Sequence, residues 1–160
     1  MEDQIRPLPA GTPAPPFALQ RSPGTRLALA GAAGQPLVLL FYPGDWEPVS
    51  QEQLSRYQRF LAEFERLKAG LAAIAPDSAW CHLAFAREQG LRFPLLADVH
   101  PHGAVARAYG VWSEADGLTG RALFVIDSRG VIRWSRGYPL NLVPSVDALI
   151  SVLERLHDAE

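Results

Sequence analysis

The sequence predicts an α/β fold in which helices flank a central mixed sheet. Three observations support this prediction. An apolar strand over residues 37–42 leads through Pro43-Gly44 into an amphipathic helix, and a second strand–helix pair follows it. This alternation implies parallel neighbouring strands joined by right-handed crossovers. Later in the chain, the turn Asp127-Ser128-Arg129-Gly130 separates two apolar strands and predicts an antiparallel hairpin.

The first half of the chain supplies a hairpin and the parallel strands. Ser22-Pro23-Gly24 is a turn signal between two apolar stretches and predicts an N-terminal β-hairpin extension. Residues 37–42 are all apolar, which is typical of a central parallel strand because both of its faces are covered. Apolar residues at steps of three and four predict one helix over 50–68. A strand over 71–75 follows, and then a helix that is capped by Asp77 or Ser78 and runs to residue 89.

The second half completes a thioredoxin-like order of elements. A short strand over 93–97, a short helix over 103–109 and a polar loop over 113–120 precede the second hairpin. A helix over 145–157 then closes the fold. No repeat or change of composition marks a second domain. We therefore expect a single domain over 13–157, preceded by an extended, partly mobile arm over 1–12.

The composition is that of an ordinary globular protein. Of the 160 residues, 48% are hydrophobic and 20% are charged, which allows a sizeable core and argues against disorder. A net charge of −2 gives no support for a nucleic-acid partner or an anionic membrane. No apolar run approaches the roughly 20 residues of a membrane helix. The charged N-terminus lacks the apolar segment of a signal peptide, so we expect a cytoplasmic protein.

The cysteine and histidine content limits the possible chemistry. Cys81 is the only cysteine, so the sequence predicts no intrachain disulfide and no cysteine-based zinc site. His100 and His102 are the only closely spaced histidines, and they lack acidic or cysteine partners at ligand spacing. We interpret them as solvated loop residues and expect no metal or cofactor.

The segment between the first central strand and its helix resembles the active-site segment of a known family. In an open α/β sheet this joint lies where such folds place their chemistry, and the first N–H groups of the helix favour an anion. The segment reads Phe-Tyr-Pro-Gly-Asp-Trp-Glu-Pro-Val-Ser over 41–50. It resembles the peroxiredoxin pattern Pro-x-x-x-Thr/Ser-x-x-Cys. With Pro43 aligned, the family's Thr/Ser falls on Glu47 and its peroxidatic cysteine falls on Ser50.

Three further segments extend the resemblance over roughly residues 13–156. They are the sequence FPLLAD over 93–98, GAVARAYGV over 103–111 and RALFVID over 121–127. Together they resemble the peroxiredoxin Q and AhpE-like branches of the alkyl hydroperoxide reductase and thiol-specific antioxidant family. The resemblance implies an antioxidant thiol peroxidase that reduces hydrogen peroxide or organic hydroperoxides. It also implies regeneration by a thioredoxin-like or other thiol reductant, and a monomer or homodimer.

The resemblance also implies roles for individual residues, each beside an ordinary structural interpretation. Arg121 would border the reactive sulfur and bind a peroxide oxygen, or would reach water from a strand end. Pro43 would shield the sulfur, and it also ends a strand. Glu47 would repel a thiolate unless it pairs with Arg121 or is protonated, or it would simply point to water. Because consecutive strand–helix units place both helix starts on the same sheet edge, Cys81 would be a resolving thiol for a cysteine at position 50, or else a small buried apolar residue.

Serine at position 50 decides what this chain is expected to do. A serine hydroxyl is almost wholly un-ionised at neutral pH, whereas thiol peroxidases attack with a thiolate, so the chain is predicted to be inactive at Ser50. The serine is either an engineered replacement that mimics the reduced enzyme or the natural residue of an inactive relative. The alternative function is a non-catalytic thioredoxin-fold protein that binds a partner or senses redox state through Cys81. Hydrolysis with Ser50 as nucleophile ranks last, because no histidine–carboxylate pair is visibly placed to activate it.

Overall fold

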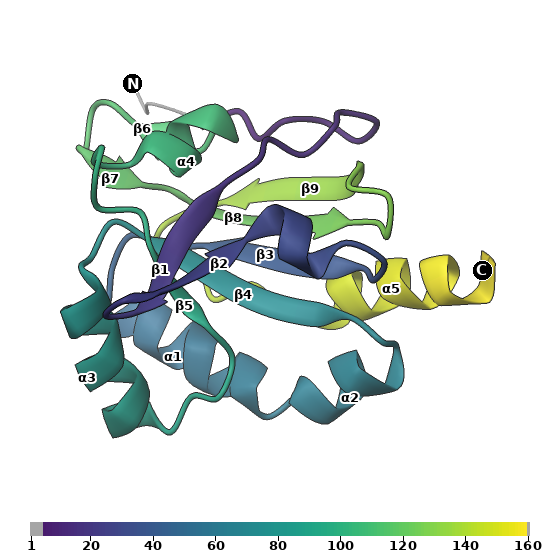
Figure 1. The fold of residues 1–160 in the computed structure, drawn as a ribbon, viewed down its shortest axis with the longest axis horizontal. Helices are drawn as coiled ribbons and strands as arrows, with labels where there is room; N and C mark the ends of the chain where they lie inside the picture. The colour runs from purple at the N-terminus through teal and green to yellow at the C-terminus, as the bar shows by residue number, and fades with distance from the viewer. Residues whose placement is uncertain (1–4, 160) are drawn as a thin grey trace.

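The structure is a computed structural model that describes residues 5–159. Its main sheet contains seven strands in the order β2-β1-β5-β4-β3-β8-β9, and β6 and β7 form a separate two-stranded sheet (Figure 1). The strands are β1 Ala18–Ser22, β2 Thr25–Ala28, β3 Leu37–Phe41, β4 Gly70–Ala75, β5 Leu95–Ala97, β6 Trp112–Ser113, β7 Leu118–Thr119, β8 Arg121–Ile126 and β9 Ile132–Tyr138. The α-helices are α1 Pro48–Gln58, α2 Leu61–Arg66, α3 Ala79–Gln89, α4 Ala104–Ala108 and α5 Asp147–Ala159, and a 3-10 helix covers Leu29–Ala32.

The mixed sheet confirms the predicted fold class. Strands β3, β4 and β5 are parallel, whereas β8 and β9 add to the edge of β3 as an antiparallel hairpin. The predicted N-terminal hairpin, β1 and β2, joins the opposite edge through β5. Each parallel crossover contains a helix, which is why the sequence alternates between strand and helix patterns.

Alternation along β3 divides the core between the two faces of the sheet. Val38 and Leu40 belong to a cluster that is completed by apolar residues of α1, α2, α3 and α5. Leu37, Leu39 and Phe41 point to the other face, where α4 and the N-terminal segment cover them. Because successive side chains of a strand point to opposite faces, both faces of this strand must be apolar. This requirement explains the uninterrupted apolar run.

The pairing of β8 with β3 positions Arg121. In the antiparallel register Ala122 pairs with Phe41, so β8 begins beside the end of β3. Leu123 and Val125 belong to the cluster on the face that carries α1. Arg121 is two residues before Leu123 and therefore points to that same face. The topology thus directs the arginine toward the start of α1.

Two predictions about local structure are wrong. The single helix predicted over 50–68 is interrupted between α1 and α2, where Arg59 and Phe60 donate backbone bonds three residues back, to Arg56 and Tyr57. This tightening turns Phe60 outward, to 38% exposure, although its spacing predicted a place on the buried face. The polar loop predicted over 113–120 instead contributes to the small antiparallel pair of β6 and β7.

The N-terminal segment lies along the body of the protein. Within residues 5–12, the N–H groups of Arg6 and Leu8 donate to the carbonyls of Gly110 and Tyr109, at 2.9 and 3.1 Å. The first four residues of the predicted arm lie outside the described residues. Over residues 5–159, no helix combines the length and apolar character needed to cross a membrane.

Candidate functional site

The loop from β3 to α1 ends in an unusual helix cap. Glu47 is the N-cap of α1, and Pro48 occupies the first helical position. The Glu47 carboxylate accepts hydrogen bonds from the N–H groups of Val49 and Ser50, at 2.8 and 2.9 Å. Free N–H groups at a helix start attract anions. In this chain, the protein's own carboxylate satisfies them.

Arg121 is fully buried and has several partners. Its Nη1 donates to Oγ of Ser50 at 3.1 Å and to Oε1 of Gln53 at 3.0 Å. Its Nη2 donates to Oε1 of Glu47 at 2.7 Å and to the Leu140 carbonyl at 2.8 Å, and Nε donates to that carbonyl at 3.2 Å. A buried guanidinium requires such compensation. The interpretation of Arg121 as a strand-end residue that reaches water is therefore wrong.

Ser50, Glu47 and Arg121 form one connected group. The Ser50 hydroxyl donates to Oε1 of Glu47 at 2.6 Å, and the same carboxylate oxygen pairs with the guanidinium. Partial burial acts to raise the pKa of Glu47, but bonds from the Ser50 hydroxyl, the Val49 N–H and Arg121 outweigh it and hold that pKa below its ordinary value. Glu47 is therefore an anion at neutral pH and a poor base for the serine.

The structure brings three of the five predicted site residues into contact. Ser50, Glu47 and Arg121 share hydrogen bonds, so the interpretation of Glu47 as a residue that simply points to water is wrong. Pro43 is buried two residues after the end of β3, in the position expected of a strand terminator. Cys81 lies on α3 beside a different group of side chains.

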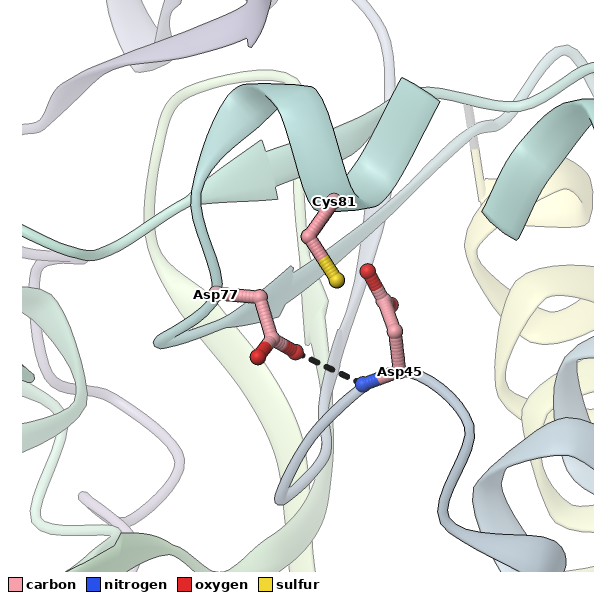
Figure 2. Close-up of side chains that lie close together, drawn as sticks. All are labelled: Asp45, Asp77 and Cys81. Atoms are coloured by element: carbon pink, nitrogen blue, oxygen red, sulfur yellow. Dashed lines mark hydrogen bonds between the residues drawn. The ribbon is translucent and has the colours of Figure 1, made fainter. Parts of the chain in front are cut away.

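Cys81 faces two carboxylates (Figure 2). Its sulfur and one oxygen each from Asp45 and Asp77 lie within 4.8 Å of one another. Burial raises the pKa of the Cys81 thiol to about 11, and the charges of Asp45 and Asp77 add to the effect, while the Trp46 side chain opposes it. The cysteine is half-buried, so the purely apolar interpretation is too simple. The two aspartates already have hydrogen-bond partners, and we assign no metal to this group.

Sequence reasoning missed two features of the site. Gln53 is fully buried and bonds Arg121, and its spacing of one helical turn from Ser50 was the available signal. His82 is also buried, and its Nδ1 donates to Oδ2 of Asp45 at 2.7 Å. These two residues are far apart in sequence, but both follow parallel strands whose ends meet at the same sheet edge. His100 and His102 are exposed, as predicted.

The arrangement favours a negative charge at the start of α1. Backbone N–H groups and a buried guanidinium converge on the Glu47 carboxylate and the Ser50 hydroxyl. A thiolate at position 50 would find the same donors and would be stabilised by them. In this chain the anion that these donors bind is the Glu47 carboxylate, which has no redox chemistry.

Comparison with known proteins agrees with this geometry. The chain matches the AhpC/TSA family over residues 10–135. Alkyl hydroperoxide reductase E of Mycobacterium tuberculosis is 37% identical over 129 residues, which cover 80% of this chain and 84% of that protein. The chloroplastic peroxiredoxin Q of Sedum lineare is 31% identical over 147 residues, covering 91% and 78% of the two chains. The structure of Mycobacterium tuberculosis AhpC superposes with a TM-score of 0.84 at 24% identity over 97% of this chain and 96% of that one, which shows the shared fold.

Proposed function

The chain belongs to the AhpC/TSA family of peroxiredoxins, and from this membership we propose that it carries a thiol-peroxidase site in which Ser50 occupies the nucleophile's position. The substrate class is a hydroperoxide, either hydrogen peroxide or an organic one. A thioredoxin-like or other thiol protein would be the reductant, and the protein would act as a monomer or homodimer. The chain itself is inactive at position 50, because a serine hydroxyl does not ionise at neutral pH.

The contact between Arg121 and position 50 is the observation that carries this proposal. The guanidinium lies 3.1 Å from Oγ of Ser50, and no part of its side chain is exposed to water. With cysteine at position 50, the thiolate would attack one peroxide oxygen and break the O–O bond. The sulfur would become a sulfenic acid, and the other oxygen would leave as water or an alcohol after taking a proton. Arg121 would stabilise both the thiolate and the charge that develops on the departing oxygen.

The Glu47 carboxylate supplies the negative charge that a thiolate at position 50 would carry in an active peroxidase. Its carboxylate takes the hydrogen bonds of the Ser50 N–H and Arg121, which a thiolate would otherwise receive. A carboxylate beside a thiol would raise the pKa of that thiol and slow its attack. Serine at position 50 and glutamate at position 47 therefore form a compensating pair, and full peroxidase activity requires both residues to change.

The experiment compares S50C and E47T/S50C with the unaltered chain, by following peroxide consumption with an excess of thiol reductant. Threonine is chosen because it is a favourable helix N-cap. We expect the double variant to be fastest, S50C to be intermediate, and the unaltered chain to show only the background from Cys81. S151C is the matched control, because it places a thiol at an exposed serine on α5. Rates of both position-50 variants no higher than that of S151C would refute the proposal.

Redox sensing through Cys81 is the weaker alternative. A sensing cysteine needs appreciable thiolate at neutral pH, and burial together with Asp45 and Asp77 raises the pKa of Cys81 to about 11. Its role as a resolving thiol remains a proposal. Thiol titration of E47T/S50C after peroxide exposure tests that role, since a disulfide would consume both cysteines.

A further inference from the structure

Trp46 has a backbone conformation that tryptophan rarely adopts. Its φ is 67°, in the left-handed region, which residues other than glycine rarely adopt. The residue directly precedes Glu47, so its conformation sets the direction in which the helix cap leaves the loop. Such a conformation persists only where its surroundings enforce it. Contacts on both sides of Trp46 must therefore fix the chain.

Asp45 is fixed on the N-terminal side by three hydrogen bonds. Its Oδ1 accepts from the Tyr42 hydroxyl at 2.7 Å, and its Oδ2 accepts from Nδ1 of His82 at 2.7 Å. Its own N–H donates to Oδ2 of Asp77 at 2.6 Å. The Asp45 and His82 side chains are 0% and 1% exposed, so water does not compete for the bond between them. Asp45 has little freedom to move.

His82 connects this loop to the sheet. Its Nδ1 bonds Asp45, and its Nε2 bonds the Leu96 carbonyl on β5 at 3.1 Å. The imidazole thus bridges the β3–α1 loop and a strand two positions away in the sheet.

We propose that Asp45 and His82 are positioning residues that hold Trp46 in its left-handed conformation and thereby direct the Glu47 side chain toward Ser50 and Arg121. Glu47 then reaches the helix N–H groups and the guanidinium at the same time. The Trp46 ring, packed edge-on against Phe85 with centroids 5.0 Å apart, supports the same conformation from α3. The inference rests on the proposed function in treating this group as the catalytic pocket.

The test uses two substitutions that separate the two bonds of His82. In H82N the amide nitrogen takes the place of Nδ1 and retains the bond to Asp45. In H82Q the amide nitrogen of the longer glutamine takes the place of Nε2, so the bond to the Leu96 carbonyl remains and the bond to Asp45 is lost. Both remove a ring that is 99% buried and leave a similar void, so a purely structural role would affect them alike. D45N, which preserves side-chain shape, is the third variant.

The readout is the pKa of Glu47, followed by ¹³C NMR of its carboxyl carbon in the Ser50 chain. We expect the pKa to rise toward its ordinary value of about 4.5 in H82Q and D45N, and to remain at the wild-type value in H82N. An unchanged pKa in H82Q and D45N, or equal changes in H82N and H82Q, would overturn the inference. No peroxide turnover is measured, so the result is independent of whether the position-50 variants regain activity.

Discussion

Replacing Arg121 by methionine should destabilise the protein by about 3 kcal/mol, the lower end of the range for breaking a buried ion pair. The substitution leaves Glu47, Gln53 and the Leu140 carbonyl without their shared donor. The lower end applies because the Glu47 side chain is 33% exposed and can recover part of its hydration. For a domain of this size, such a loss corresponds to a fall in Tm of roughly 6–12 °C.

Urea unfolding, followed by tryptophan fluorescence and circular dichroism, measures this loss. The matched control is R133M on the adjacent strand β9, where the arginine side chain is 53% exposed and its ion pair with Asp127 spans 3.4 Å. We expect the control to lose less than about 1 kcal/mol, as is usual for an exposed pair. An R121M loss no larger than that of R133M would refute the claim that the buried guanidinium organises this site.

Two further predictions concern titration. Cys81 should react with a disulfide reagent at pH 8 more slowly than a free cysteine, because its pKa is about 11. The D77N substitution should accelerate this reaction. Equal rates in D77N and in the unaltered chain would contradict the role of the Asp77 carboxylate. Because the pKa of Glu47 is lowered in the folded state, its contribution to stability is present above about pH 4.5 and is lost as pH falls through the folded value. The difference in unfolding free energy between wild type and E47Q should therefore narrow on acidification, and a difference that stays constant down to acid pH would contradict this.

The sequence predicts most of the fold because its patterns arise from local geometry. The apolar run of β3 reflects the burial of both strand faces. Ser78 and Gly90 mark the two ends of α3 because they satisfy the free backbone groups there. The break before α2 has no such marker, since no proline or glycine lies at Arg59 or Phe60. Its position depends on how the two short helices pack against the sheet.

The site is harder to predict because its contacts join distant segments. Ser50 and Arg121 are 71 residues apart, and only the family resemblance connected them before the antiparallel register of β8 was known. The charge of Glu47 repels a thiolate but suits an arginine, and only the three-dimensional geometry decides between these outcomes. The bond between His82 and Asp45 joins residues 37 positions apart, and no spacing pattern in the sequence pairs them.

The central claim is that the start of α1 and Arg121 form a pocket for an anion, which Glu47 now supplies. The most direct test is the pKa of the thiol introduced in S50C/C81S and in E47T/S50C/C81S, measured by thiolate absorbance against pH. We predict a value below the ordinary cysteine pKa of about 8.5 once Glu47 is replaced, and a higher value while Glu47 remains. Equal values in the two variants, or a value of 8.5 or above without Glu47, would contradict the account.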